Sequence, residues 1–408
     1  MTKDHQHQTG STILFYSIGD MVGGAQRSML ELATGLRDLH GYSPVVLTLG
    51  LGALRRHCER GRIPTKTLTP LHLKKRESPS RWGSLITKAK KTLALVLALA
   101  SFSQHALKLR PAVIYLNDAP GILPSLLASK LTHAPIVFHV RAKHRVPFFT
   151  ALAFRFADRI FFVSEDTKQV LHPSEHHRYK EKNLTIPTGF QSPAPLPDSR
   201  ASILEALKRY HDINWDTLER PVFLVLGSFD PRKNQTHALH AFKDFRKTTG
   251  RGHLVLCGPT TFGYRYLDDL KAETKSYGLQ YATTFIEGTD LPHHLLRVTD
   301  ITIISSFIEG LPRVAIESLR QSTPVISYPV SGIQDIVRNQ YCGRITTDFC
   351  PSQLATLMIE AHKDQSFWSV NAEHERLRVG QSFDYESYIC RFAEELENKF
   401  SLPSSRRS

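Results

Sequence analysis

The sequence predicts an α/β protein with two Rossmann-like, doubly wound parallel-sheet domains that face a central cleft. Short apolar runs alternate with segments of helical periodicity, which is typical of parallel strands covered by helices on both faces. The alternation stops at the proline-rich stretch 191–197 and then starts again. The chain has 408 residues. Two domains of roughly 180–200 residues are therefore the natural division.

The first half of the chain shows this alternation from its beginning. The apolar run 12–17 predicts a strand, a glycine-bearing turn follows at 19–24, and apolar residues at helical spacing from Ala25 to Leu36 predict a helix. Four further apolar runs predict the remaining strands of this half. They are 44–49, 112–116, 135–140 and 159–163.

The second half repeats the pattern and ends in an amphipathic helix. Its predicted strands are 222–226, 253–256, 283–286, 301–304 and 324–327. Tyr385, Ile389 and Phe392 lie on one stripe of the terminal helix. We therefore expect domains at 1–190 and 191–380, followed by a segment, 381–408, whose helix packs back on the first domain.

Basic residues are in excess and unevenly placed. The net charge is +14, and the stretch 51–91 holds twelve Lys and Arg but only two acids. Such a block attracts nucleic acid, anionic lipid head groups or phosphate-bearing substrates, although a solvated loop and helix face is the plain alternative. Residues 81–91 beside the apolar run 93–100 suggest a helix that rests on an anionic membrane, against the alternative of a buried helix.

The sequence has no feature of a secreted or membrane-spanning chain. No apolar signal segment follows the N-terminus, and the longest apolar run, 93–100, is far shorter than the ~20 residues that cross a bilayer. The five cysteines form no C-x-x-C pair, so neither a zinc site nor a disulfide framework is expected. We expect a cytoplasmic protein, with peripheral contact at the inner face of the membrane as a further expectation.

The segment 305–319 is the most informative one for function. It follows a predicted strand, Gly310 permits a tight turn, and Pro312 suits the first turn of a helix. The start of that helix presents N–H groups and the positive end of its dipole, which together bind anions such as a diphosphate. Glu309 and Glu317 can face the same ligand, and carboxylates accept hydrogen bonds from sugar hydroxyls. A capped surface helix with two solvated acids is the alternative.

Two more segments are typical of phosphate-binding sites. Arg232 and Lys233 lie in the loop after the strand 222–226, where two cations can neutralise a diphosphate leaving group. Gly23 and Gly24 open a helix after the first strand, as in a phosphate-binding turn. That turn is neither G-x-G-x-x-G nor a P-loop with its lysine, which disfavours dehydrogenases and P-loop enzymes.

A fourth basic segment follows the strand 135–140. His139 could touch a donor sugar or an acceptor, although a single histidine at a strand end is more often structural. Arg141, Lys143 and Arg145 could receive a phosphorylated acceptor.

These motifs together resemble the group 1 glycosyltransferases, a retaining class with the GT-B fold. The resemblance runs over 13–392. Glu309 and Glu317 match the family's E-x7-E motif, and Lys233 matches its lysine in the loop after the first strand of the second domain. The glycine turn 23–25 matches the family's N-terminal glycine turn.

The resemblance implies a role for each site residue. The second domain would bind the nucleotide diphosphate, with Glu317 on the ribose, Glu309 on the transferred sugar and Lys233 on the phosphates. His139 would act beside them, as a third catalytic residue. The remaining predicted donor ligands are Arg232, Gly310, Leu311, Arg313, Gly23 and Gly24.

The resemblance also implies the chemistry. The acceptor hydroxyl would attack on the face that the leaving group occupies, so the anomeric configuration is retained, and the departing phosphate would take the proton. No cofactor or metal ion is expected, and no D-x-D pair occurs in the sequence. The substrates would be a UDP- or GDP-linked sugar and a glycan or lipid-linked acceptor of cell-surface polysaccharide synthesis.

The chain departs from the family pattern at four positions, which keeps alternatives open. Ser228 stands where the family commonly has arginine, and Gln26 where it has glutamate. Thr188 stands in the place of an asparagine, and Val140 follows His139 where many members have aspartate. One alternative is a nucleotide-sugar epimerase of the same fold. Another is a non-catalytic basic protein that binds nucleotides, nucleic acid or membranes, although the sequence holds no known nucleic-acid motif and nucleic acid is not an expected partner.

Overall fold

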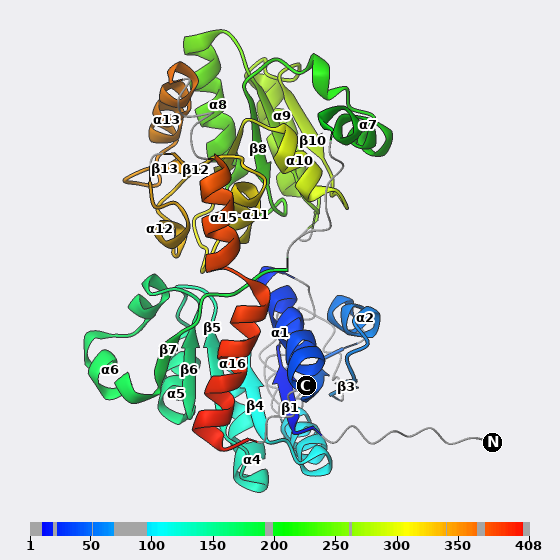
Figure 1. Cartoon of the computed structure of the whole chain (residues 1–408), viewed down its shortest axis with the longest axis vertical. Coiled ribbons are helices and arrows are strands. Elements are labelled where there is room, and N and C mark those ends of the chain that lie inside the picture. The colour runs from blue at the N-terminus through cyan, green and yellow to red at the C-terminus, as the bar shows by residue number, and fades with distance from the viewer. Residues whose placement is uncertain are drawn as a thin grey trace, which may run out of the picture. The chain divides into compact units, whose positions relative to one another are not determined.

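The computed structural model describes two compact units, drawn in Figure 1. Unit 1 takes in Met1–Phe190 and Tyr385–Ser408, and unit 2 takes in Gln191–Asp384. The described residues are 10–18, 23–50, 52–68, 96–191, 199–260, 263–339, 341–364 and 372–402.

Unit 1 is built on a seven-stranded sheet in the order β3-β2-β1-β4-β5-β6-β7, in which all pairs are parallel. The central strand β4 (Val113–Leu116) is buried along its whole length, as expected for a strand covered on both faces. The other strands are β1 (Thr12–Tyr16), β2 (Ser43–Thr48), β3 (Thr65–Thr67), β5 (Ile136–Val140), β6 (Arg159–Phe162) and β7 (Asn183–Thr185).

Alternate residues of β1 point into two different cores of unit 1, because strand side chains alternate between the faces of a sheet. Ile13 and Phe15 belong to the core beneath α1 (Gly24–His40), α2 (Ala53–Arg60) and α16 (Tyr385–Phe400). Leu14 and Tyr16 belong to the core beneath helical residues 96–109, α4 (Ile122–Thr132) and α5 (Pro147–Phe156). Short helices complete the unit: η1 (Ala119–Gly121), η2 (Asp166–Val170), α6 (Pro173–Arg178) and η3 (Lys180–Lys182).

The C-terminal helix α16 packs against α1 (Figure 1). The Tyr385 hydroxyl donates to the carbonyl of Glu31 at 2.7 Å, and Arg159 pairs with Glu395 at 2.6 Å. A Cβ at Gly35 would lie 2.6 Å from Ile389, so the close approach of the two helices requires glycine there. The last helix therefore belongs to the unit that the chain begins with.

Unit 2 has a six-stranded sheet in the order β10-β9-β8-β11-β12-β13, again with all pairs parallel. Its strands are β8 (Val222–Leu226), β9 (His253–Cys257), β10 (Thr283–Ile286), β11 (Ile301–Ile304), β12 (Val325–Ser327) and β13 (Gly343–Ile345). Its helices are α7 (Arg200–His211), η4 (Trp215–Thr217), α8 (Gln235–Thr249), α9 (Arg265–Ser276), α10 (Pro292–Val298), α11 (Arg313–Arg320), α12 (Ile333–Ile336), α13 (Pro351–Lys363) and α15 (Ala372–Ser382).

The α/β fold with two parallel sheets is as predicted. All ten predicted strands are present, and three further strands, β3, β7 and β13, had not been predicted. The chain divides between Phe190 and Gln191, and unit 2 extends to Asp384 rather than to 380, because α15 packs against α11. Several sequence features lie wholly or partly outside the described residues. They are the N-terminal residues 1–9, the first part of the glycine turn (19–22), most of the basic stretch with its predicted helix (69–95) and the proline-rich stretch (192–198). Among the described residues, no helix combines the length and apolar character needed to traverse a bilayer.

Candidate functional site

The candidate site lies in unit 2, at the carboxyl ends of β8 and β11. These two strands are neighbours in the sheet, so the loops that follow them, 227–234 and 305–312, lie side by side. The carboxyl ends of parallel strands are where open α/β sheets bind ligands.

Three hydrogen bonds join the two loops. The Phe307 amide donates to the Arg232 carbonyl at 2.9 Å, and the Ser305 hydroxyl donates to the Lys233 carbonyl at 3.0 Å. The Asn234 side-chain amide donates to the Ser305 carbonyl at 3.1 Å. The backbone that carries Lys233 is thereby fixed against the loop that carries Glu309. Neither Asn234 nor Ser305 had been predicted, although a polar residue at a helix start or a strand end is a recognisable signal.

Lys233 and Glu309 meet directly in this fixed arrangement. Lys233 Nζ lies 2.6 Å from Glu309 Oε1, and their side chains are 33% and 16% exposed. Because the two side chains meet, the cation can bind the negative charge of a ligand while the carboxylate accepts hydrogen bonds from hydroxyls of the same ligand. The structure therefore brings together the two residues predicted to be catalytic in this unit.

Helix α11 begins beside this pair. Pro312 is its N-cap residue and the helix starts at Arg313, one residue later than predicted. No side-chain cap bond forms at this end, and the positive end of the helix dipole faces the loop. Of the first-turn amides, that of Ala315 donates to the Pro312 carbonyl at 3.0 Å. A Cβ at Gly332, whose φ is +74°, would lie 2.6 Å from the Gly310 carbonyl oxygen. The backbone before α12 therefore packs directly on the turn that opens α11.

Glu317 lies one helical turn further along α11, with a different cation. Its Oε1 is 2.7 Å from Arg313 Nε, and the two side chains are 17% and 31% exposed. His293, at the start of α10, faces this pair; burial lowers the pKa of His293, and the negative charge of Glu317 opposes that effect. Glu317 thus stands in a group with Arg313 and His293, whereas Glu309 stands with Lys233.

The predicted phosphate ligand Arg232 is held by Asp230. Arg232 Nη2 lies 2.6 Å from Asp230 Oδ2, and the Arg232 amide also donates to this carboxylate. Burial alone would raise the pKa of Asp230, but the hydrogen bonds from Arg232 outweigh it and hold that pKa below its ordinary value. The Asp230 side chain is 4% exposed and that of Arg232 is 65% exposed, so the buried carboxylate of Asp230 orients the exposed guanidinium of Arg232. Asp230 had not been predicted.

Each cation of this site has a carboxylate partner. Lys233 pairs with Glu309, Arg232 with Asp230 and Arg313 with Glu317. An incoming dianion would therefore bind by exchanging partners with these carboxylates, aided by the start of α11. Among the described residues, no group of three or more His, Cys, Asp and Glu side chains could hold a metal ion.

The glycine turn lies in unit 1, at the start of α1. Gly23 is the N-cap residue, and its amide donates to Gln26 Oε1 at 3.2 Å. Gln26 in turn donates to the hydroxyl of Ser17, which donates to Asp118 at 2.5 Å. A Cβ at Gly24 would meet no atom of the described residues within 4 Å.

The structure argues against a substrate contact by His139. Its ring is 0% exposed, its Nδ1 lies 2.8 Å from the Tyr115 hydroxyl, and it stacks on Phe392 of α16 at 5.9 Å between centroids. Burial, with the nearby charge of Arg141, lowers the pKa of His139 well below its ordinary value. We therefore correct the predicted catalytic role: His139 is a neutral core histidine.

The three predicted acceptor ligands all bind side chains of unit 1. Arg141 donates to the Tyr115 hydroxyl and to Asn117, at 2.8 and 2.9 Å. Lys143 donates to Gln169. Arg145 forms a two-pronged ion pair with Glu175, at 2.7 and 2.9 Å. These pairings orient the three side chains, and their role toward an acceptor stays a prediction.

Family models match both units. Residues 210–378 match the model described as Glycosyl transferases group 1, and residues 23–189 match the Glycosyl transferase 4-like domain. YtcC of Bacillus subtilis (strain 168) is 22% identical over 186 residues. That match covers 44% of this chain and 46% of YtcC, which is less than two thirds of the relative's length.

Solved structures resemble the whole chain. HepE (Alr3699) of Anabaena, in complex with UDP-glucose, has a TM-score of 0.75 at 20% identity, covering 95% of this chain and 100% of that one. A glycosyltransferase from Rickettsia africae ESF-5 has a TM-score of 0.76 at 18% identity, covering 96% and 99%. At such identities the likeness shows a common fold.

Proposed function

Because this chain belongs to the group 1 glycosyltransferases of the GT-B fold, we propose that it transfers a sugar from a nucleotide-diphosphate sugar to a glycan or lipid-linked acceptor. The observation that carries this proposal is the 2.6 Å contact of Lys233 with Glu309, beside the uncapped start of α11. A diphosphate ester needs a cation and N–H donors at its phosphates, and its sugar needs an acceptor of hydroxyl hydrogen bonds. The two loops supply these groups side by side.

The proposed donor is UDP-linked, with a GDP-linked sugar as the second choice. HepE of Anabaena, which has the same fold, has been crystallised with UDP and with UDP-glucose. In the present chain, Glu317 would accept hydrogen bonds from the ribose hydroxyls. Lys233, Arg232 and the start of α11 would bind the two phosphates, and Glu309 would bind the hydroxyls of a hexose.

The proposed reaction retains the anomeric configuration and uses no metal ion. The acceptor oxygen forms its bond to the anomeric carbon on the face from which the diphosphate leaves. The bond from that carbon to the diphosphate oxygen breaks, and the acceptor proton passes to the departing phosphate. Lys233 and the helix start stabilise the negative charge that develops on the leaving group, which is the charge a metal ion otherwise meets.

The proposed acceptor side is unit 1, and the proposed setting is cell-surface polysaccharide synthesis. Gly24 and the polar side chains of Gln26 and Ser17 lie at the carboxyl end of β1. A phosphorylated or glycan acceptor would find hydrogen-bond partners at this edge of the sheet.

The test is donor hydrolysis and transfer with a panel of UDP- and GDP-sugars. We expect turnover with one donor, and a loss of about 10²–10³-fold in kcat for Lys233→Ala, because it removes a cation from the leaving group. Glu317→Ala should raise KM for the donor. Lys247→Ala, an exposed residue at the end of α8, is the matched control and should have no effect.

Two outcomes would refute the proposal. One is wild-type turnover that survives both Lys233→Ala and Glu317→Ala. The other is the absence of hydrolysis, transfer and nucleotide binding across the panel. Rates that fall with EDTA and return with Mn²⁺ would refute the metal-independent mechanism and leave the transfer itself standing.

A further inference from the structure

Polar side chains of unit 1 meet at the carboxyl end of β4, which lies between β1 and β5 in the sheet. Two of them, Asn117 and Asp118, directly follow the strand. Asn117 is bound toward β5, because its Oδ1 accepts a hydrogen bond from Arg141 Nε at 2.9 Å. Asp118 is bound toward β1, because its Oδ2 accepts from the Ser17 hydroxyl and the Ile18 amide, at 2.5 and 3.2 Å. The end of this strand therefore has a cation on one side and a carboxylate on the other.

Arg141 is a partly exposed cation whose hydrogen-bond partners are neutral. Its guanidinium donates to Asn117 and to the Tyr115 hydroxyl, at 2.9 and 2.8 Å. Its charge also acts on Tyr388 of α16, where it opposes the rise in pKa that burial causes. Within the part of the chain that the structure describes, Arg141 forms no ion pair. A guanidinium that is partly removed from water and has no carboxylate partner favours the binding of an anion beside it.

The two other basic residues that were predicted to bind an acceptor already have acidic partners. Arg145 Nη1 lies 2.7 Å from Glu175 Oε2, and Lys143 Nζ lies 3.8 Å from Asp166 Oδ1. An anion that binds either of them has to compete with a carboxylate of the protein. Arg141 imposes no such cost, so the structure singles it out of the three.

Asn117 supplies a second hydrogen-bond donor beside Arg141. The residue is 5% exposed, and its buried Nδ2 has no hydrogen-bond partner. Because Oδ1 of the same amide binds Arg141, Nδ2 lies next to the guanidinium. A buried amide donor without an acceptor is costly to the folded state. An N–H group and a guanidinium side by side match two oxygens of one carboxylate or phosphate.

Asp118 offers a hydrogen-bond acceptor on the other side of the strand end. Its bonds within the described ranges both reach Oδ2, so Oδ1 can accept from a hydroxyl of a ligand. The two donors on Oδ2 also offset its negative charge. Gln26 donates to the Ser17 hydroxyl at 3.3 Å and thereby holds the side chain that orients Asp118. A ligand that carries both an oxyanion and hydroxyls therefore finds a partner for each.

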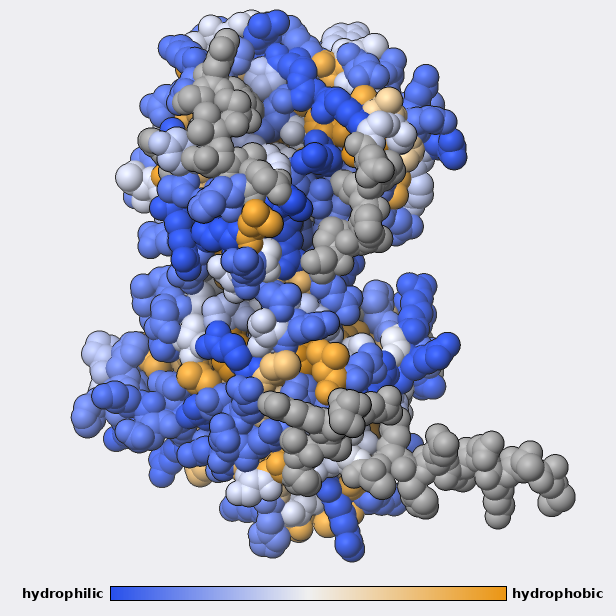
Figure 2. Space-filling view, in the orientation of Figure 1, coloured by the Kyte–Doolittle hydropathy of each residue, from blue (hydrophilic) through white to orange (hydrophobic). Residues whose placement is uncertain are grey.

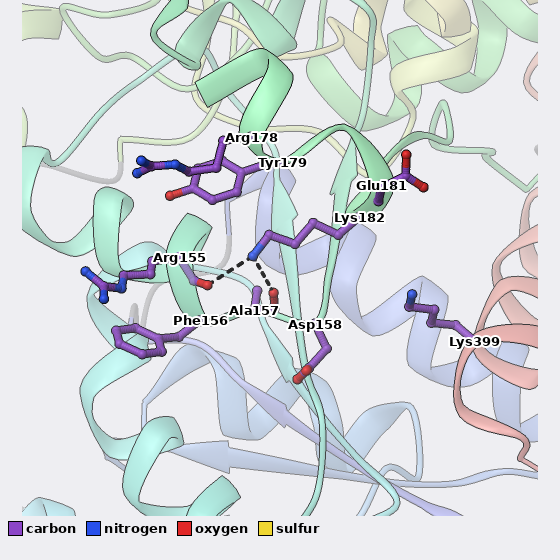
Figure 3. A pocket seen from close by; sticks show the side chains of 9 residues that line it. All are labelled: Arg155, Phe156, Ala157, Asp158, Arg178, Tyr179, Glu181, Lys182 and Lys399. Atoms are coloured by element: carbon purple, nitrogen blue, oxygen red, sulfur yellow. Dashed lines mark hydrogen bonds between the residues drawn. The ribbon is translucent and has the colours of Figure 1, made fainter. Parts of the chain in front are cut away.

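A second basic region of unit 1 lies around α6, whose surface is mostly hydrophilic (Figure 2). A cavity of about 410 Å³ lies beside that helix (Figure 3), and the acids Asp158 and Glu181 line it together with four cations. One of these cations, Lys182, donates to two backbone carbonyls at 3.1 and 2.8 Å. Arg178 and Lys399 lie on opposite sides of Lys182 in Figure 3, so the cations do not converge on one ligand group.

We propose that Arg141, Asn117 and Asp118 form a site for an acidic sugar of the acceptor. The carboxylate or phosphate of that sugar binds Arg141 and Asn117 Nδ2, and one of its hydroxyls donates to Asp118 Oδ1. The proposal rests on the proposed transferase function and narrows its acceptor to an anionic glycan. A neutral sugar would satisfy Asp118 but would leave the charge of Arg141 without an anion.

The test is calorimetric titration of the full chain, without a nucleotide sugar, with glucose 6-phosphate, glucuronate and neutral glucose. We expect at least one of the two anions to bind about tenfold or more tightly than glucose, because hydrogen bonds to a charged group are the stronger ones. The two anions distinguish a phosphate from a carboxylate. Arg141→Gln should abolish the preference, since it removes the charge and keeps an amide that can donate to Tyr115.

An isosteric variant tests the same site without a loss of volume. Asn117→Asp gives Arg141 the carboxylate partner that it lacks, so we expect the preference for an anion to disappear while the melting temperature stays at or above that of the wild type. This result separates a lost site from a lost fold. A preference that persists in folded Asn117→Asp would contradict the proposal.

Two variants elsewhere show where the anion binds. Arg178→Gln, in the cavity of Figure 3, is the matched control and should keep the preference. Lys233→Ala detects an anion that binds instead at the phosphate position of unit 2. The proposal is overturned if the wild type binds glucose as tightly as both anions, if Arg141→Gln keeps the preference, or if either of these two variants loses it. Because no donor is present, such a failure leaves transfer to a neutral acceptor standing.

Discussion

Lys233 and Glu309 neutralise one another at 2.6 Å, so a diphosphate that binds Lys233 replaces one anionic partner by another. The pairing holds both side chains in place, which lowers the entropy lost when a ligand binds. The pairing also adds a free-energy cost to binding, because Glu309 must accept new hydrogen bonds when Lys233 turns to the phosphates. Sugar hydroxyls can supply them.

This exchange predicts opposite effects of one substitution on binding and on turnover. In Glu309→Gln, Lys233 loses its negative partner, so we expect UDP to bind severalfold more tightly than to the wild type. Transfer should nevertheless slow by at least about tenfold, because the carboxylate that binds the sugar hydroxyls is gone. Calorimetry and a transfer assay measure the two effects. Weaker UDP binding by this variant would contradict the exchange.

The residues of the unit 2 site were predictable because they are adjacent in sequence to strand ends. Lys233 and Glu309 follow β8 and β11, and neighbouring strands in a parallel sheet bring such loops together. His139 also follows this logic but lies within β5, where alternation turns its ring into the core under Phe392. The sequence alone could not show this, because the covering helix α16 comes some 250 residues later in the chain.

At the scale of elements, α11 links the candidate site to the chain connections of unit 2. Its last residue, Arg320, is buried and donates to the carbonyls of Gln191 and Phe383, at 3.3 and 2.9 Å. These two residues flank the points where the chain passes from one unit to the other, after Phe190 and after Asp384. The helix whose start faces the candidate site thus binds, at its other end, backbone at the first residue and near the last residue of unit 2.

Removing that guanidinium should destabilise unit 2. Arg320→Ala leaves two carbonyls without their charged donor, and hydrogen bonds to charged groups are worth about 1.5–3 kcal/mol each. We expect the free energy of unfolding in urea to fall by roughly 2–4 kcal/mol. The exposed Arg209→Ala should change it by less than about 0.5 kcal/mol. Equal stability of the two variants would contradict the role of Arg320.

The buried His253 of β9 makes the stability of unit 2 depend on pH. Burial, with the charge of Arg246, lowers the pKa of His253 from 6.5 to about 4. The unfolded chain takes up a proton on this ring below pH 6.5, whereas the folded chain does so only near pH 4. Stability from this group is therefore complete above pH 6.5 and is lost as the pH falls toward 4.

His253→Gln should abolish this part of the acid dependence. In the wild type, the stability lost between pH 6.5 and pH 4 amounts to roughly 3 kcal/mol, since one pKa unit corresponds to about 1.4 kcal/mol. Urea unfolding of the wild type and the variant at pH 7.5 and pH 5 measures it. The difference in stability between the two pH values should be smaller in the variant, and an equal difference would show that His253 does not titrate as described.

The elements that the sequence failed to predict share one physical property. β3, β7 and β13 are three-residue strands at the edges of their sheets, and their residues are mostly half-buried or exposed. A strand covered on both faces needs a continuous apolar run, whereas an edge strand needs only backbone pairing on one side. Thr65–Thr67 and Asn183–Thr185 contain no such run, so their sequences do not predict strands.

At the scale of the whole molecule, the proposed donor site belongs to unit 2. UDP should therefore slow amide hydrogen exchange in the loops 227–234 and 305–312 of unit 2 and leave α4 and α5 of unit 1 unchanged. Exchange read by mass spectrometry tests this placement. Protection of α4 and α5 by UDP, without protection of the two loops, would contradict it.

The central claim is that Lys233 binds the diphosphate and Glu317 binds the ribose of one nucleotide. Calorimetric titration of UDP and of uridine into the wild type, Lys233→Ala and Glu317→Ala tests it most directly. The account predicts that Lys233→Ala weakens UDP by about tenfold or more and leaves uridine unchanged, whereas Glu317→Ala weakens both ligands. Binding of UDP to both variants with wild-type affinity would contradict it.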